Sequence, residues 1–191
     1  LTTILLHKPK GFLSTKSHEK GRKTIFELIP KSPPLNHVGR LDKDTTGAII
    51  LTNDGNLSQF LMHPKNSIEK EYIATTDKFI NEKNTKRILK GIFIGSNEKG
   101  KAKIISQETV KGKIEVKMIL KQGKKNEIRR IFKFLDLNLL SLKRTRIGEI
   151  KLSSLSLGSW RPLTKKEFNF LTRIQSRTSK TKHLGISQKK N

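Results

Sequence analysis

The apolar run Ala48–Leu51 is the segment that most restricts how this chain can fold. Gly47 precedes it, and the turn-forming triplet Asn-Asp-Gly at 53–55 follows it. A short apolar run rich in β-branched residues and bounded in this way predicts a buried strand that ends in a tight turn. Asp42, five residues before Gly47, is therefore expected on a loop just ahead of a buried strand.

Asp42 stands close to two cations, Arg40 and Lys43. A carboxylate in such a place can stay ionised while partly desolvated, because neighbouring positive charges favour its charged form. This is one way in which a nucleophilic carboxylate is prepared. The alternative is a surface turn whose acids and bases solvate each other, and for an isolated Arg-Leu-Asp that alternative is the better interpretation.

The charge of the chain predicts a polyanionic partner. Of 191 residues, 41 are Lys or Arg and 16 are Asp or Glu, which gives a formal net charge of +25. RNA, DNA and an acidic membrane surface would all satisfy this charge. Because no apolar run approaches the length of a spanning helix and the positive charge is spread along the chain, a membrane is disfavoured and nucleic acid is favoured.

The length suits one domain at 1–172 followed by a basic tail at 173–191. The tail has six Lys or Arg and no acid, so it is expected to be flexible in isolation, as a solvated tail or an arm along RNA. There is no cysteine, and the five histidines show neither paired helical spacing nor a carboxylate cluster. We therefore predict no metal.

The local patterns predict several further elements. Residues 3–6, 70–74, 101–108 and 114–120 are expected as strands, the last because Ile114, Val116 and Met118 alternate with charged residues. Helices are expected after Thr24, over residues 57–62 ahead of Pro64, over 81–91, and over 164–171.

The segment around Asp42 resembles a known motif. The segment consists of Gly39-Arg40-Leu41-Asp42-x-x-Thr45-x-Gly47, an apolar strand and then Leu51-Thr52-Asn53-Asp54-Gly55. It resembles the second motif of the RsuA/RluB/RluE/RluF family of rRNA pseudouridine synthases. The resemblance implies that Asp42 is the catalytic nucleophile and that Arg40 contacts RNA.

Two shorter segments are similar to other parts of the same family. Lys8-Pro9-x-Gly11 followed by Ser14-Thr15 resembles the first motif, which supports the active-site wall and implies RNA contacts from Lys8 and Lys10. Lys70-x-Tyr72 after His63-Pro64 matches the segment that places a tyrosine in the active site, with Lys70 as an RNA contact. An aromatic ring there could stack on an extruded uracil, and its hydroxyl could take part in proton transfer. Taken alone, Tyr72 is a half-buried strand aromatic.

Residues 122–132 form a basic, glycine-bearing loop that runs into a predicted helix, and helix N-termini attract anions. The segment resembles the third family motif, usually Gly-Arg-Asn-Arg-Gln-Ile-Arg-Arg-Met. Ile128-Arg129-Arg130 is retained, while the residues that depart from the usual motif are Lys124, Lys125, Asn126, Glu127 and Ile131. The resemblance implies that Arg129 forms a bidentate pair with Asp42, and that Lys124, Lys125 and Arg130 contact RNA.

Residues 142–163 resemble the closing segment of the family, with Arg144 as an RNA contact. Leu142 and Ile147 could wall the uracil pocket, although core packing is an equally good interpretation. The family implies an α/β fold of α+β type, with a mixed, mostly antiparallel sheet, flanking helices, a central catalytic cleft and no cofactor. The small RNA-binding domain that often precedes this domain was either lost, as in the RluE-like branch, or lies outside this sequence.

The resemblance predicts isomerisation of a uridine in ribosomal RNA of the large subunit to pseudouridine by a monomeric, cytoplasmic enzyme. In a eukaryote the location would be an organelle matrix or stroma. A non-catalytic rRNA-binding or ribosome-assembly factor with the same fold is the main alternative. A glycosidase is a further one, but no second acid stands in a matched motif.

Overall fold

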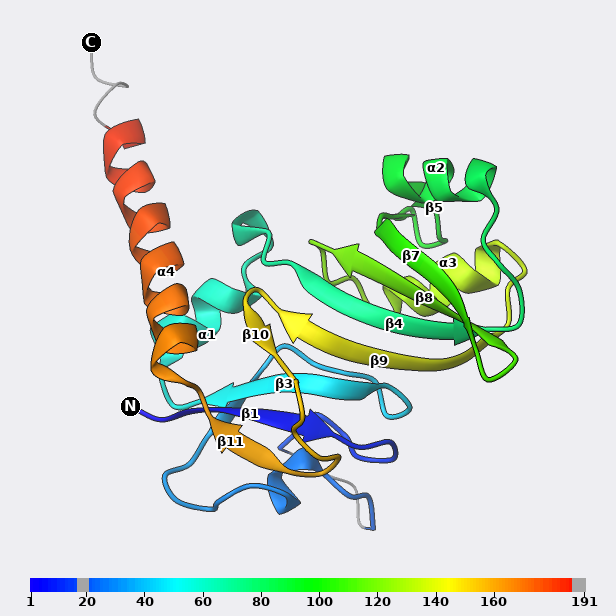
Figure 1. Ribbon diagram of the computed structural model, residues 1–191. Coiled ribbons are helices and arrows are strands. Elements are labelled where there is room, and N and C mark those ends of the chain that lie inside the picture. Colours follow the sequence, from blue (N-terminus) through cyan, green and yellow to red (C-terminus); the bar gives the residue numbers. More distant parts are fainter. Residues whose placement is uncertain (17–20, 187–191) are drawn as a thin grey trace.

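The computed structural model describes residues 1–16 and 21–186. Most of its strands belong to one sheet of nine strands, in the order β11-β1-β3-β9-β4-β8-β7, with β2 paired to β3 and β10 paired to β9. Strands β5 and β6 form a separate pair. The predicted fold class, a mostly antiparallel mixed sheet with flanking helices, is confirmed (Figure 1).

The strands and helices have the following bounds. The strands are β1 (Thr3–Lys8), β2 (Asn36–Val38), β3 (Thr46–Thr52), β4 (Lys70–Thr76), β5 (Ile92–Phe93), β6 (Lys99–Gly100), β7 (Lys103–Val110), β8 (Lys113–Leu120), β9 (Leu139–Ile147), β10 (Ile150–Lys151) and β11 (Trp160–Pro162). The α-helices are α1 (Gly55–Met62), α2 (Glu82–Lys90), α3 (Glu127–Phe134) and α4 (Lys165–Ile186), and the short 3-10 helices are η1 (Ile25–Glu27) and η2 (Pro64–Asn66).

Several helix ends follow directly from the sequence. Asp54 caps α1 by accepting a hydrogen bond from the Leu57 backbone at 2.9 Å, and Asn81 caps α2 by accepting one from Asn84 at 2.8 Å. The α1 helix ends at Met62, ahead of Pro64, whose ring cannot continue it. The expected element therefore forms in each of these places.

The parallel contact between β3 and β9 joins the two halves of the sheet. This contact consists of two register pairs, Thr46 with Lys143 and Gly47 with Arg144. Gly47 has a φ of +117°, and a Cβ atom there would lie 2.2 Å from the carbonyl oxygen of Arg144. A side chain would thus collide with the β9 backbone, so this close approach requires glycine.

Three apolar clusters hold the sheet and its cover together. The first packs α2 and α3 on β4, β7 and β8; the second packs α1 and α4 on β1 and β3; the third lies beneath the segment 25–41. Leu142 belongs to the first cluster and Ile147 to the second. Both residues thus pack in the core, as one of the two interpretations expects, and their role in a uracil pocket stays a prediction.

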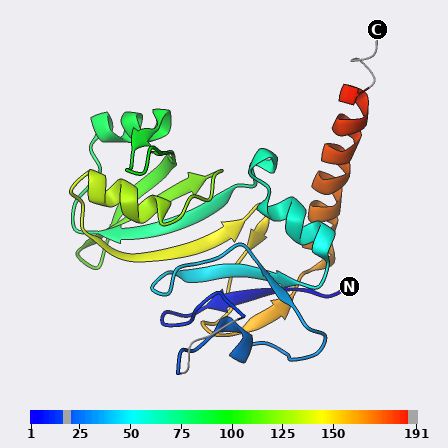
Figure 2. The ribbon, with the colours of Figure 1, turned by 180° about the vertical axis from the view of Figure 1, so that it is seen from behind.

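The last helix extends beyond its predicted end. The sequence predicts a helix over 164–171, whereas α4 continues to Ile186 and projects away from the body (Figures 1 and 2). Residues 173–186 contain many Lys, Arg and Gln, which favour helix, and no proline. The remainder of the predicted tail, residues 187–191, lies outside the described part of the chain.

Candidate active site

Asp42 lies on the loop between β2 and β3, as predicted. The loop closes through a backbone hydrogen bond from Thr45 to Asp42 at 3.0 Å, and the Ser14 hydroxyl donates to the Leu41 carbonyl at 3.1 Å. Thr45 is buried, whereas the Asp42 side chain is 44% exposed. The backbone of the loop is thus fixed while the carboxylate remains open to solvent.

Lys8 holds this loop from beneath. It is completely buried, and its Nζ donates to the carbonyl oxygens of Asp42 at 3.0 Å, Lys43 at 3.2 Å, Thr45 at 2.9 Å and Pro9 at 3.1 Å. Burial lowers the pKa of Lys8 to about 8, against the opposing effect of the Asp42 and Asp44 charges. The predicted RNA contact of Lys8 is wrong, because its ammonium group is enclosed by backbone carbonyls.

Arg129 reaches Asp42 from α3. Its Nε lies 3.6 Å from Asp42 Oδ2, and its Nη2 donates to the Thr45 hydroxyl at 3.2 Å. The two residues form an ion pair, but the predicted bidentate hydrogen-bonded geometry is absent in this structure. Arg129 thus connects α3 both to the carboxylate and to the base of its loop.

Asn126 is the neighbour of Asp42 that sequence reasoning missed. With its amide nitrogen facing the carboxylate, Asn126 Nδ2 lies 2.8 Å from Oδ1 and 2.5 Å from Oδ2 of Asp42. An asparagine before a helix has an ordinary structural explanation as an N-cap, which conceals a second role. The available signal was its place in the third motif, three residues before Arg129.

Tyr72 and Arg144 occupy adjacent strands at the centre of the sheet. They are register partners between β4 and β9, and Arg144 Nη1 donates to the Tyr72 hydroxyl at 3.4 Å. The guanidinium carbon lies 6.0 Å from the centre of the Tyr72 ring, within reach of a cation–π interaction. Arg144 is 3% exposed, and its Nε donates to the Ala48 carbonyl at 2.7 Å. Arg144 is thus buried and connects Tyr72 to β3, and its predicted contact with the RNA substrate stays a prediction.

Glu127 turns inward at the start of α3. Its carboxylate accepts hydrogen bonds from the backbone of Lys101 at 3.0 Å and of Lys124 at 3.2 Å, and the residue is 4% exposed. Burial raises its pKa, partly offset by these two hydrogen bonds. Glu127 therefore fixes the loop that leads into α3 and joins it to the chain between β6 and β7.

Arg130 also has a structural position. It donates to the carbonyls of Ile94 at 2.9 Å and Gly95 at 2.6 Å, and it pairs with Glu98 at 2.5 Å. These contacts, with a further hydrogen bond to the Lys125 carbonyl at 3.3 Å, fix the turn between β5 and β6 to α3, and the RNA contact of Arg130 stays a prediction. The adjacent position, Arg129, is the one that faces Asp42.

The other predicted RNA contacts differ in their exposure. Arg40, Lys10 and Lys125 are exposed, and Lys124 is half-buried with its Nζ donating to the Lys99 carbonyl at 2.7 Å. Lys70 is half-buried and donates to the Ile68 carbonyl at 3.1 Å. Burial, reinforced by the charge of Arg144, lowers the pKa of Lys70 to about 8.

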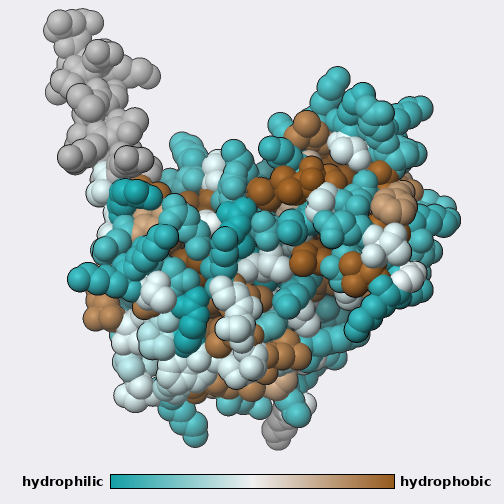
Figure 3. All heavy atoms as spheres, viewed as in Figure 1, coloured by the Kyte–Doolittle hydropathy of each residue, from teal (hydrophilic) through white to brown (hydrophobic). Residues whose placement is uncertain are grey.

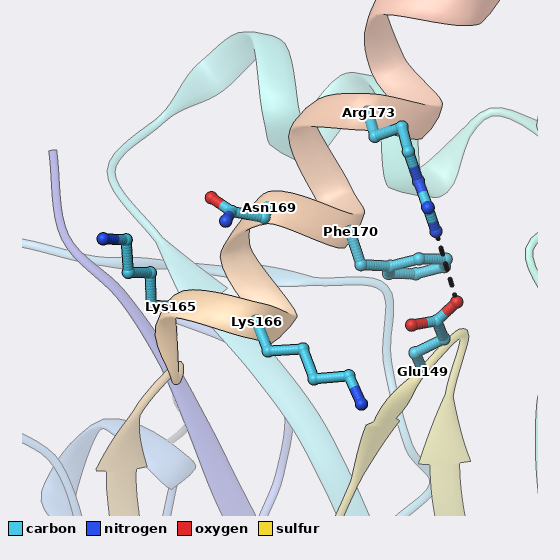
Figure 4. A pocket seen from close by; sticks show the side chains of 6 residues that line it. All are labelled: Glu149, Lys165, Lys166, Asn169, Phe170 and Arg173. Atoms are coloured by element: carbon cyan, nitrogen blue, oxygen red, sulfur yellow. Dashed lines mark hydrogen bonds and ion pairs between the residues drawn. The ribbon is translucent and has the colours of Figure 1, made fainter.

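Two hollows lie at other places in the fold. A cavity of about 430 Å³ at the foot of α4 is lined by Lys165, Lys166, Asn169, Phe170, Arg173 and, from the turn between β9 and β10, Glu149 (Figure 4). A second, of about 380 Å³, lies beside β2 and α1 and includes Asn36 and His37, a few residues ahead of Asp42. Neither includes Asp42 or Tyr72 in its lining.

Within residues 1–16 and 21–186, no group of three His, Cys, Asp or Glu side chains is placed to hold a metal ion. A search of the same part of the chain for helices long and apolar enough to cross a membrane finds none.

The chain is similar in sequence to known RNA-modifying enzymes. The family model for RNA pseudouridylate synthase matches residues 2–134. An uncharacterized RNA pseudouridine synthase of Aquifex aeolicus is 37% identical over 175 residues, which are 90% of this chain and 71% of that protein. The ribosomal large subunit pseudouridine synthase B of Bacillus subtilis is 32% identical over 167 residues, which are 86% of this chain and 68% of that protein.

Solved structures lead to the same family. A crystal structure of a pseudouridylate synthase superposes with a TM-score of 0.79 at 29% identity, covering 89% of this chain and 73% of that one. The human RNA pseudouridylate synthase domain containing 1 shares the fold, with a TM-score of 0.52 at 13% identity and 91% coverage of each chain. The matched segment 2–134 contains Asp42, Tyr72, Asn126 and Arg129, and on these sequence and structural matches the chain belongs to the RNA pseudouridylate synthase family and is a pseudouridine synthase.

Proposed function

We propose that this chain converts a uridine in ribosomal RNA of the large subunit to pseudouridine, with Asp42 as the nucleophile. The observation that carries the proposal is the half-exposed Asp42 carboxylate on a loop whose backbone is fixed by a buried lysine. A nucleophile needs both access and a fixed direction, and this loop supplies both. The name of the Bacillus subtilis relative supports the choice of large-subunit RNA.

The reaction is an isomerisation, so no atom is gained or lost overall. The target base is flipped into the site at a cost of roughly a few kcal/mol, which is smaller in a loop than in a duplex. Asp42 attacks either the anomeric carbon of the ribose or the base, and the N-glycosidic bond breaks. The uracil rotates, a bond forms between its C5 and the anomeric carbon, and the bond to Asp42 breaks. N1 takes up a proton and a base removes the C5 proton, so no atom is gained or lost.

Tyr72 and Arg144 are suited to receive the flipped uracil. Because Arg144 donates to the Tyr72 oxygen, the phenolic hydrogen is free to point elsewhere. The ring itself can stack on the base. The link from Arg144 to the Ala48 carbonyl ties this pair to β3, the strand that begins four residues after Asp42.

The basic surface supports an RNA substrate. The exposed residues Arg40, Lys10 and Lys125 are available for phosphate contacts, and Lys124 precedes Lys125 in the chain. Hydrophilic side chains cover much of the face shown in Figure 3. We assign α4 and the following residues the role of a basic arm along RNA, since 173–191 carry six Lys or Arg and no acid.

The test separates catalysis from binding. Asparagine has nearly the shape of aspartate but no charge and little nucleophilicity, so Asp42→Asn should retain the fold and RNA affinity while abolishing pseudouridine formation. Tritium release from C5-labelled uridine in rRNA fragments measures turnover, and filter binding of the same RNA at fixed salt measures affinity.

Two results would contradict the proposal. A wild-type protein that binds rRNA but releases no tritium from any fragment would be a binding or assembly factor. An Asp42→Asn variant that releases tritium at the wild-type rate would show that another group is the nucleophile.

A further inference from the structure

The Asn126 side chain lies beside Asp42, although its position as the N-cap of α3 does not require this contact. Asn126 is the N-cap residue of α3, with φ 53° and ψ 30°, a left-handed conformation that asparagine adopts more readily than most residues. An N-cap asparagine ordinarily accepts a hydrogen bond from a backbone N–H of the first turn through its side-chain oxygen. Here the side chain makes no capping hydrogen bond.

The Asn126 side chain points at the carboxylate of Asp42 instead. Its Nδ2 lies 2.8 Å from Oδ1 and 2.5 Å from Oδ2 when the amide nitrogen faces Asp42. An amide oxygen in that place would face only acceptors, so the surroundings select this orientation. Both distances are shorter than the 3.6 Å between Arg129 Nε and Oδ2. Within the part of the chain that the structure describes, Asn126 thus contacts the carboxylate more closely than Arg129 does.

The loop before α3 is held without the Asn126 side chain. The buried carboxylate of Glu127 accepts hydrogen bonds from the backbones of Lys124 and Lys101. The Asn126 carbonyl still accepts the intrahelical hydrogen bond from the Arg130 backbone at 2.9 Å. Because the main chain and Glu127 maintain the start of the helix, the Asn126 amide can donate to Asp42 without weakening the helix end.

We infer that Asn126 is a positioning residue for the nucleophile, an inference that rests on the proposed function. Its amide fixes the plane of the Asp42 carboxylate, so that one oxygen can attack while the other stays hydrogen-bonded. The third motif usually has arginine at this position, so this chain places a neutral donor there. Arg129 is then the residue of α3 that supplies positive charge to Asp42.

The first variant removes the amide and keeps the backbone. Glycine adopts φ 53° without strain, so Asn126→Gly should fold normally. We expect kcat to fall about tenfold or more, with RNA affinity and KM within about twofold of wild type. Asn97→Gly is the matched control, because Asn97 is an exposed asparagine with φ 56° in the turn between β5 and β6. That control should leave kcat unchanged.

Two further variants test how the charge and the hydrogen-bond donor at position 126 act on Asp42. Asn126→Asp retains the shape but places a negative charge against Asp42, so the acidic limb of the pH profile of kcat/KM should move to higher pH. Asn126→Arg restores a donor and should recover turnover relative to Asn126→Gly. An acidic limb at the wild-type pH in Asn126→Asp would contradict the contact between the two side chains.

An NMR titration tests the contact between Asn126 and Asp42 without measuring enzymatic activity. It therefore separates this inference from the proposed function. The side-chain amide resonances of Asn126 should shift in NMR spectra as acid protonates Asp42, and this titration should vanish in Asp42→Asn. Amide resonances that do not titrate in wild type would overturn the contact whatever the enzymatic activity. If they titrate but Asn126→Gly turns over at the wild-type rate, the positioning role is overturned while the proposed function stands.

Discussion

Replacing Lys8 by methionine tests whether the buried ammonium group positions the nucleophile loop. Methionine has a similar length and keeps the apolar packing, but it donates nothing to the four carbonyls. Two of those carbonyls keep a second donor, since Thr45 donates to Asp42 and Gly11 donates to Lys43. The loss therefore falls mainly on the carbonyls of Pro9 and Thr45, at about 1–3 kcal/mol each.

An opposing effect of similar size limits the loss of stability. Burial lowers the pKa of Lys8 from 10.5 to about 8, which corresponds to about 3 kcal/mol of free energy spent on keeping the group charged at neutral pH. Methionine removes that cost. We therefore expect the free energy of unfolding of Lys8→Met to lie within about 3 kcal/mol of the wild-type value. Turnover should fall about 100-fold, because the loop backbone is no longer held in one place.

Urea unfolding, tritium release and filter binding together measure these effects. RNA affinity should be unchanged in Lys8→Met, whereas in Lys10→Met, a change at an exposed residue, affinity should fall and kcat should not. Turnover within about threefold of wild type in folded Lys8→Met would refute the positioning role. Weak RNA binding with intact kcat would restore the interpretation of Lys8 as an RNA contact.

Three further predictions concern Arg129 on α3, Gly47 on β3 and Lys70 on β4. Arg129→Ala should lower kcat about 100-fold with RNA affinity within about threefold, and the reverse pattern would make Arg129 a phosphate contact. Gly47→Ala should lower the free energy of unfolding by about 3 kcal/mol or more in urea, because its Cβ would meet the Arg144 carbonyl; a loss below 1 kcal/mol would contradict the close approach. Burial lowers the pKa of Lys70 to about 8, so between about pH 8 and 10.5 the unfolded chain binds more protons than the folded one. The wild-type protein should therefore gain stability relative to Lys70→Met as the pH rises through that window. An equal stability difference at both ends of the window would contradict this.

The elements of the fold were predictable where the signal was local. The alternation of Ile114, Val116 and Met118 predicts β8, and Pro64 predicts the end of α1. Both patterns depend on side chains within one or two turns or along one strand. The end of α4 was missed because a charged composition was interpreted as disorder, although lysine, arginine and glutamine favour helix.

The site was predictable only where a motif names the side chain. Asp42 and Arg129 lie next to each other as expected, since both belong to motifs with fixed spacing. The resemblance to the family implied RNA contacts for Lys8, Arg130 and Arg144, but it does not say which atoms inside the fold each cation meets. Apart from Glu98 for Arg130 and the Tyr72 hydroxyl for Arg144, their partners are backbone carbonyls, between 34 and 96 residues away in all but two of these contacts. A carbonyl oxygen has no residue type, so no sequence pattern marks it as an acceptor.

The narrow parallel contact between β3 and β9 has a consequence for folding kinetics. It brings together residues 97 positions apart, Thr46 with Lys143 and Gly47 with Arg144. The β1–β3 and β4–β8 pairings close shorter loops, so they can form before this contact does. Because Tyr72 and Arg144 are on one side of the contact and Asp42 on the other, we expect enzymatic activity to return later during refolding than the circular-dichroism signal of the separate halves.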